Sequence, residues 1–145
     1  MRLSKNFVLS EITRSNTARR KGISNEPEKK HLANLQTIIT ELIQPMRDAI
    51  GPIRISSGYR SPKLNRAIGG SSRSQHCKGE ALDLQFWKDG EMNNQVIYDW
   101  VLDSGLEFDQ MINEFDFAWI HISFSSGKNR KQVLEAYKND QGKTA

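Results

Sequence analysis

The sequence predicts an α+β fold in which helices flank a small central antiparallel sheet. Apolar residues first recur at three- and four-residue spacing, which is typical of an amphipathic helix. They then alternate with polar residues in short segments, which is typical of strands. The period changes at Gly51-Pro52. The chain has 145 residues, the length of one domain, and we expect residues 1–145 to form a single unit.

The longest predicted helix begins after Asn25, a residue type that caps helix N-termini, with Glu28 at the capping-box position. We expect Pro45 to kink or stop this helix and Gly51-Pro52 to end any continuation. Upstream, residues 10–14 favour a short helical turn. The buried stripe of the long helix comprises Leu32, Leu35, Ile38, Ile39, Leu42, Ile43 and Met46.

Strands are predicted around Ile53 and Ile55 and over residues 81–86, with a glycine-rich loop from Gly58 to Gly79 between them. Residues 107–114 and 119–124 favour a hairpin around the turn 115–118. A last helix is expected near residues 131–138. Another helix, closed by Gly105, is predicted from Met92, Val96, Ile97, Trp100 and Val101.

Two polar residues stand in strands where alternation points them away from the core. Asp83 alternates with Leu82 and Leu84, and His121 lies in the second strand of the hairpin. His76 precedes Asp83 by seven residues. Two imidazoles and a carboxylate with an open fourth position can form a catalytic zinc site. Spacing alone leaves the alternative that these histidines are ordinary hydrogen-bonded residues.

Charge and cysteine content narrow the choice of partners. The net charge of +4 suits a polyanion, either nucleic acid or a cell wall with teichoic acids. No interleaving of basic and aromatic residues supports nucleic acid, which we therefore do not expect. No apolar run is long enough for membrane insertion. The single cysteine, Cys77, is adjacent to His76, and we expect it to be passive.

The chain resembles the M15 group of zinc peptidases in SGYRSPKLNRAIGGSSRSQHCKGEALDL and in the downstream segment WIHIS. This group includes D-alanyl-D-alanine carboxypeptidases and phage endolysins that cut peptidoglycan stem peptides. The segments NFVLSEITRS and QPMR are similar to its compact single-domain branch. The motif S-x-H-x-x-G-x-A-x-D matches at Ser74, His76, Gly79, Ala81 and Asp83. The motifs W-x-H and S-G-Y-R match at Trp119 and His121 and at Ser57, Gly58, Tyr59 and Arg60.

The resemblance implies a fold shared with lysostaphin-type peptidases and the hedgehog signalling domain. It implies Zn²⁺ held by His76, Asp83 and His121, and amide hydrolysis of peptidoglycan stem peptides. We expect the protein to be a monomer. Arg60 would hold or polarise the substrate, and we expect Tyr59, beside it in the same motif, to bind substrate too. Ser74 either binds substrate or caps its own loop. The N-terminus shows no signal peptide, so we expect phage- or prophage-dependent release to the cell wall.

The general base is less directly indicated. Better-known members of the group carry an acid three positions before the last histidine, where this chain has Ala118. If residues 115–118 form the turn, Glu114 pairs with Trp119 and shares a face with His121. A turn of odd length would favour Asp116 instead, and Asp109 and Glu107 are farther away. We predict that Glu114 is the base.

Three functions remain open from the sequence. The first is an active peptidoglycan peptidase of the D-Ala-D-Ala carboxypeptidase or L-Ala-D-Glu endopeptidase type. The second is a zinc-binding module without activity, for wall binding or signalling. The third is a basic wall- or nucleic-acid-binding domain without a metal.

Overall fold

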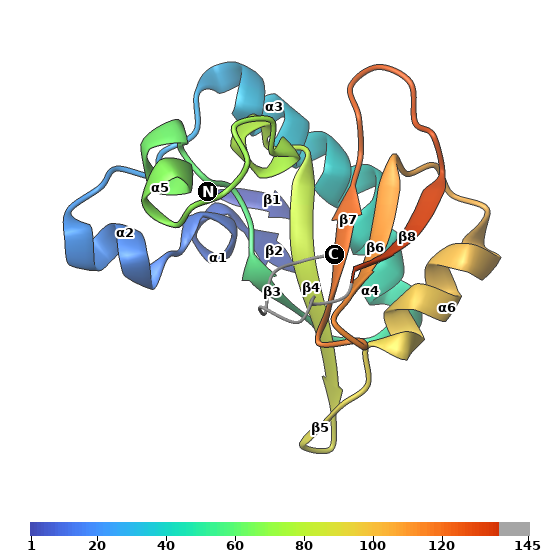
Figure 1. Ribbon diagram of the computed structural model, residues 1–145. Helices are drawn as coiled ribbons and strands as arrows, with labels where there is room; N and C mark the ends of the chain where they lie inside the picture. Colours follow the sequence, from blue (N-terminus) through green and yellow to red (C-terminus); the bar gives the residue numbers. More distant parts are fainter. Residues whose placement is uncertain (137–145) are drawn as a thin grey trace.

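A computed structural model of the chain describes residues 1–136, in which a sheet lies against a layer of helices (Figure 1). The helices are α1 (Leu9–Thr13), α2 (Asn16–Lys21), α3 (Lys29–Ile38), α4 (Gln44–Ile50), α5 (Pro62–Ala67) and α6 (Gln95–Ser104), with a π-helical turn η1 (Ile39–Ile43) and a 3₁₀ turn η2 (Gln75–Lys78). The strands are β1 (Arg2–Ser4), β2 (Phe7–Val8), β3 (Ile53–Ser57), β4 (Ala81–Lys88), β5 (Glu91–Met92), β6 (Gln110–Glu114), β7 (Trp119–Ser123) and β8 (Gln132–Ala136). The α+β fold class is confirmed.

The main sheet has the strand order β3-β4-β7-β6-β8, and β5 pairs with β4 outside this path. Neighbouring strands are antiparallel except β6 and β8, which run parallel. The predicted hairpin is confirmed, because β6 and β7 pair around the turn 115–118. Strands β1 and β2 form a separate two-stranded sheet, which the sequence did not predict.

The helix expected near residues 131–138 is wrong for the part that the structure describes. Residues 132–136 form β8, and residues 137 and 138 lie outside the described range. The segment contains good helix formers, but its backbone pairs with β6 from Gln110 opposite Gln132 to Glu114 opposite Ala136. Hydrogen bonding along this edge satisfies the backbone groups of β6, and it outweighs local helix propensity.

The long predicted helix begins later than expected. Its N-cap is Glu28, whereas Asn25 makes tertiary contacts. The Asn25 side-chain amide donates to the carbonyl oxygens of Thr13 and Tyr59 at 2.8 and 2.9 Å. Its side-chain oxygen accepts from the backbone N–H of Ser61 at 2.7 Å. Because three distant backbone groups use this side chain, it holds the segment after β3 against α1 and does not cap a helix.

Pro45 does not stop the helix, which continues through η1 and α4 to Ile50. Proline lacks the N–H that an α-helical ladder needs at its position. The turn just before it widens to a π-helix, with the N–H of Gln44 donating to the carbonyl of Ile39. Gly51 then ends the helix, as predicted.

The remaining predictions hold with shifted boundaries. Helix α6 begins at Gln95, and Met92 lies in β5, which pairs back onto β4. Gly105 takes the left-handed conformation that closes α6, as predicted. The expected glycine-rich loop contains α5 and η2. Within residues 1–136, no helix has the length and apolar character required to cross a bilayer.

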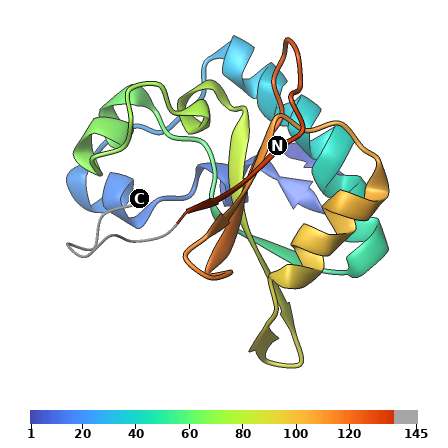
Figure 2. The same ribbon diagram turned by 45° about the vertical axis from the view of Figure 1, so that its right-hand side comes forward.

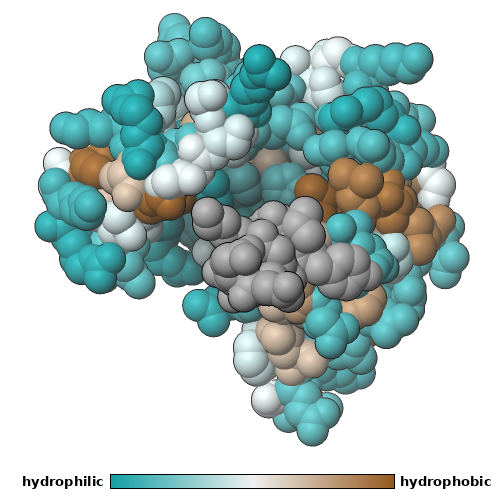
Figure 3. Space-filling model, viewed as in Figure 1, coloured by the Kyte–Doolittle hydropathy of each residue, from teal (hydrophilic) through white to brown (hydrophobic). Residues whose placement is uncertain are grey.

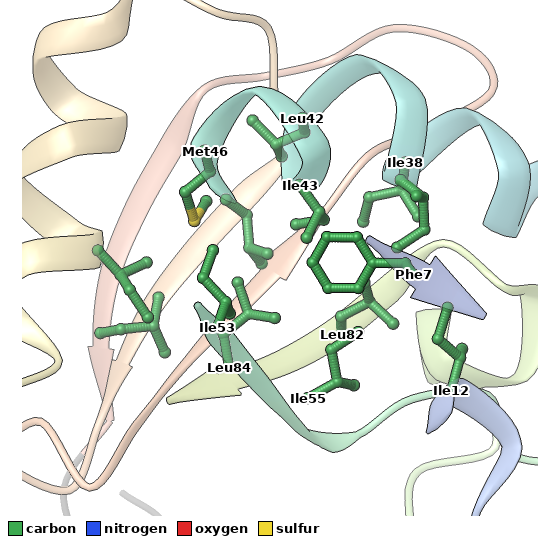
Figure 4. Packing of buried hydrophobic residues seen from close by; sticks show 14 of the residues in the cluster. Phe7, Ile12, Ile38, Leu42, Ile43, Met46, Ile53, Ile55, Leu82 and Leu84 are labelled. Atoms are coloured by element: carbon green, nitrogen blue, oxygen red, sulfur yellow. The ribbon is translucent and has the colours of Figure 1, made fainter. Parts of the chain in front are cut away.

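The two faces of the main sheet have different environments. Figure 4 shows Leu82, Leu84 and Ile53 of the sheet packed against Ile43 and Met46 of the helical layer. Figure 2 shows the same helices on one side of the sheet. Burying each large apolar side chain stabilises the fold by roughly 1.5–3 kcal/mol. The register that keeps the leucines of β4 inside therefore places the residues between them on the opposite face.

Candidate metal centre

Asp83 and His121 lie side by side on the face of the sheet that points away from the helices. Strands β4 and β7 are neighbours, and Asp83 is directly opposite His121. Directly paired residues present their side chains on the same face. Nδ1 of His121 lies 3.0 Å from Oδ1 of Asp83. Alternation in the sequence thus correctly predicted that both residues avoid the core.

His76 joins this pair from the turn η2. Its Nε2 atom lies 3.3 Å from the same Oδ1 atom of Asp83. One candidate ligand atom from each of His76, Asp83 and His121 lies within 4.8 Å of the other two. Ligand atoms around a tetrahedral zinc at 2.0–2.2 Å are roughly 3.3–3.6 Å apart. The three side chains therefore fit one zinc ion after small movements.

The orientation of His76 is set by its surroundings. Ser74 caps η2, and its Oγ atom accepts from the backbone N–H of His76 at 3.2 Å. Nδ1 of His76 lies 2.7 Å from the carbonyl oxygen of Gly58. Because a carbonyl oxygen can only accept, Nδ1 carries the proton and Nε2 is free to bind a metal.

Two glycines allow the close packing on which this arrangement depends. A Cβ atom on Gly58 would lie 2.2 Å from the carbonyl oxygen of Ile12 in α1. A Cβ atom on Gly79, which ends η2 with φ of +72°, would lie 2.4 Å from the carbonyl oxygen of His31 in α3. The backbone around His76 is thus packed directly against two helices.

The carboxyl of Asp83 is ionised at neutral pH. Burial by itself raises the pKa of Asp83, but the adjacent imidazoles of His121 and His76 outweigh burial and hold this pKa well below its usual range. The ionised carboxylate is the form that binds a metal ion.

Arg60 lies at the edge of the metal centre. Its Nη2 atom is 3.8 Å from Oδ2 of Asp83 and 3.4 Å from Oγ of Ser57. Its Nε atom is buried and has no hydrogen-bond partner among the described residues. The backbone N–H of Arg60 donates to the carbonyl of His76 at 3.2 Å, which ties this residue to η2. The guanidinium of Arg60 thus lies beside Asp83, and part of the side chain is accessible to a bound molecule.

Tyr59 is packed in the protein core, unlike the adjacent Arg60. It belongs to the buried core, and its hydroxyl lies 3.3 Å from Nδ1 of His31. Burial, then the charges of Glu28 and Cys77, raise the pKa of Tyr59. His31 is half-buried against this tyrosine.

Cys77 is not part of the cluster that could hold a metal in residues 1–136. Burial raises the pKa of its thiol, and the charge of Arg60 only partly opposes this. The thiol is therefore protonated at neutral pH, which agrees with a passive role.

The position of Glu114 follows from the hairpin register. Glu114 is opposite Trp119, and Ile112 is opposite His121, as the four-residue turn predicts. Glu114 therefore shares a face with His121. Burial raises the pKa of Glu114 above its ordinary value of 4.5, while His121 opposes the rise and Asp83 adds to it. The two charges that act on Glu114 thus belong to two of the three candidate metal ligands.

The other acids considered from the sequence have different environments. Asp116 is exposed in the turn. Asp109 is buried and accepts hydrogen bonds from Arg130, with its two oxygens 2.9 Å from Nε and Nη2 of that arginine. Glu107 is exposed and pairs loosely with Lys131 at 3.8 Å. Of these acids, Glu114 is the one that the register places beside His121.

Sequence reasoning missed a support for the His76 turn. Oδ2 of Asp109 also accepts from Nε2 of Gln75 at 3.1 Å, and Gln75 immediately precedes His76. Arg130, Asp109 and Gln75 thus link the loop before β8 to η2. These residues are far apart in the chain and form no local motif, so the sequence carried no signal for their contact.

The fold and the cluster are those of a candidate metallohydrolase, with three ligand-type side chains on one face of an α+β sheet. The profile of the M15 peptidase family matches residues 5–123. The match covers most of the chain, and the chain belongs to the M15 family of peptidases.

The chain is also similar to the zinc D-Ala-D-Ala carboxypeptidase of Streptomyces albus G. The two are 36% identical over 82 residues, which cover 54% of this chain and 31% of that relative. This chain thus matches less than a third of the length of the carboxypeptidase.

Proposed function

We propose that this chain is a zinc-dependent peptidase that hydrolyses peptide bonds in the stem peptides of peptidoglycan. The observation that carries the proposal is the convergence of His76, Asp83 and His121 within 4.8 Å. Membership in a peptidase family and similarity to a zinc D-Ala-D-Ala carboxypeptidase support the reaction and the substrate class.

The donor set suits zinc. Two imidazole nitrogens and one carboxylate oxygen are borderline-to-hard ligands, and a site with three protein ligands leaves a position for reactants. When bound, Zn²⁺ would polarise the scissile carbonyl and make water more acidic. In this assignment His76 binds through Nε2 and His121 through Nδ1, the atoms that face Asp83.

Glu114 is assigned the role of general base. Its carboxylate takes a proton from the attacking water and delivers it to the nitrogen of the leaving amine. The raised pKa of Glu114 brings this carboxyl closer to the range in which it can both accept and donate a proton. Its place on the His121 face of the hairpin supports the assignment.

Arg60 is assigned to the substrate. Its charge stabilises the oxygen of the scissile carbonyl as negative charge develops there. The position of the Arg60 side chain, 3.8 Å from Asp83 and on the wall of a neighbouring polar pocket, supports this role. Ser74 positions His76 through its backbone contact, so we assign it no direct contact with substrate.

A second candidate is a zinc-binding module without catalytic activity. The presence of Ala118, where better-known relatives carry an acid, favours it. The register that places Glu114 beside His121 favours the active enzyme instead. Zinc analysis combined with digestion of purified peptidoglycan separates the two.

The experiment uses the zinc-loaded full chain and purified peptidoglycan, with fragments identified by mass spectrometry. We expect one zinc per chain and new fragments from stem peptides. Release of D-Ala identifies a carboxypeptidase, whereas separation of L-Ala from D-Glu identifies an endopeptidase. One zinc per chain with no new fragments would support the inactive module, and absence of zinc would contradict both candidates.

A further inference from the structure

A polar pocket of about 210 Å³ opens beside the metal centre and is not explained by the residues assigned so far. Of the residues that the structure describes, three arginines line it, Arg14, Arg54 and Arg60, and no acidic residue does. We propose that this pocket binds a carboxylate group of the stem peptide that is being cut. The proposal rests on the proposed function, and it adds the part of the substrate that the enzyme recognises.

The three arginines come from separate segments. Arg14 follows α1, Arg54 lies in β3, and Arg60 lies in the loop after β3. Arg54 is paired with Gln85, two residues along β4 from Asp83, and therefore shares the sheet face of the metal centre. The N–H of Tyr59 donates to the carbonyl of Ile12, which holds the end of α1 against this loop.

Among residues 1–136, no acidic side chain pairs with Arg14 or Arg54, and only Asp83 lies near Arg60. Arg14 and Arg54 are exposed, and neither side chain forms a hydrogen bond or ion pair with another described residue. The Arg60 side chain contacts Asp83 at 3.8 Å, a loose ion pair, and donates to Oγ of Ser57 at 3.4 Å. Like charges held close together repel, so a bound anion stabilises the arrangement. A guanidinium group matches a carboxylate through two parallel hydrogen bonds.

The inner wall of the pocket is shared with the metal centre. Ser57 and Gly58 line the pocket, Ser57 is opposite Asp83, and the carbonyl of Gly58 accepts from His76. A carboxylate in the pocket therefore belongs to the same substrate molecule, close to the bond that is cut. A stem peptide offers such groups at its C-terminus and on D-Glu, which keeps one of its two carboxyl groups outside the main chain.

The pocket also has an apolar side, formed by Leu64 and Ile68 of the α5 region. Figure 3 shows mainly hydrophilic surface over α2 and α5, with small apolar patches among it. Apolar side chains next to an arginine cluster suit a carboxylate carried on a short aliphatic side chain or an alanine methyl group.

The test compares matched peptides. The substrate is L-Ala-γ-D-Glu-L-Lys-D-Ala-D-Ala, with each free carboxylate replaced in turn by a carboxamide. The variants are Arg14→Met and Arg54→Met, which remove the charge but keep an aliphatic side chain. Arg2→Met is the control, because Arg2 lies in β1, which packs against η1, and does not line the pocket.

We expect one of the two carboxylates to be the group that the pocket binds. On the peptide that keeps this carboxylate, each pocket variant should show a kcat/KM about tenfold below that of the wild type, mainly through a higher KM. On the matching amide, the variants and the wild type should differ by less than twofold. The loss on the acid should shrink at high salt, since exposed charges are screened. Zinc content and the circular dichroism spectrum should not change in any variant. Two results would overturn the proposal. One is an equal loss of kcat/KM by Arg54→Met on the free-acid and carboxamide peptides, and the other is an equal KM of the wild type for these two peptides.

Equilibrium binding separates this proposal from the proposed function. Calorimetry on the Glu114→Gln variant measures affinity for the same peptides without turnover. If the wild type cuts none of the peptides, the proposed function fails, and weaker binding of the acid in the arginine variants still supports the pocket. If the peptides are cut but acid and amide bind equally, only the pocket assignment fails. Equal binding of the acid and amide peptides is also the result expected if the pocket binds phosphate groups of the cell wall instead of a peptide carboxylate.

Discussion

The ring of His76 is fixed by the carbonyl oxygen of Gly58, which lies 2.7 Å from its Nδ1 atom. This contact leaves Nε2 as the atom that faces Asp83. Only glycine fits at this position, because the Cα atom of Gly58 lies too close to the backbone of Ile12 to leave room for a side chain. The metal centre thus depends on packing between α1 and the loop after β3.

The first prediction follows from this packing. In Gly58→Ala, the new methyl group meets backbone rather than a flexible side chain, so the loop must move and carry the Gly58 carbonyl with it. We expect zinc affinity to fall by about 10–100-fold, as for other losses of a hydrogen bond to a metal-binding histidine. Competition with a chelator measures the affinity. Gly127→Ala is the control, since the nearest atom to its Cβ would be 3.7 Å away. Unchanged affinity in Gly58→Ala would show that the carbonyl does not orient His76.

The second prediction concerns the ligands. His76→Ala, Asp83→Ala and His121→Ala should each lose stoichiometric zinc, because three ligands leave no redundancy. Elemental analysis of the purified variants measures the zinc. Cys77→Ser should keep both zinc and activity, since Cys77 lies outside the cluster. A ligand variant that retains one zinc per chain would show that the ligand set is wrong.

The third prediction concerns the base. Glu114→Gln should keep the fold and the zinc but lose at least about a hundredfold in rate, the low end for removal of a general base. Asp116→Asn is the matched control, because Asp116 is exposed in the adjoining turn. If Asp116→Asn lost activity and Glu114→Gln did not, the base would be Asp116.

The fourth prediction is a pH dependence from the same residue. The base must be deprotonated, so the rate should fall as pH drops through the pKa of Glu114. Because burial raises this pKa, the fall should be centred above 4.5, the ordinary glutamate value. A pH profile of kcat/KM measures it. A rate that stays constant down to pH values below 4.5 would contradict the assignment.

The fifth prediction concerns the support of η2. Hydrogen bonds from Arg130 lower the pKa of Asp109 and outweigh the effect of burial. A carboxyl with a lowered folded pKa stabilises the fold above its unfolded pKa, and this contribution is lost as pH falls through the folded value. Asp109→Asn should therefore lower the midpoint of thermal unfolding by about 5 °C at neutral pH. The difference from wild type should shrink below pH 3.8, the ordinary aspartate value. Glu107→Gln, which breaks only an exposed pair, should have little effect.

The sequence by itself determined the parts of the site that depend on alternation along single strands. The period of two places Asp83 and His121 on the face opposite Leu82 and Ile120, because a shift by one residue would expose the apolar set. The length of the turn 115–118 likewise predicts that Glu114 faces the same way as His121, and the observed register agrees. These features depend on contacts between neighbours in the chain or across one hairpin.

Only the tertiary structure decided how distant segments meet. It uses Asn25 to join α1 to the site loop rather than to cap α3, and it pairs residues 132–136 with β6 rather than coiling them into a helix. It brings the arginines after α1, in β3 and in the following loop around one pocket. Local propensity differs by about 1 kcal/mol or less per residue between helix and strand, so backbone pairing and burial across the fold outweigh it. Such contacts between distant segments cannot be predicted from the spacing of residues along the chain.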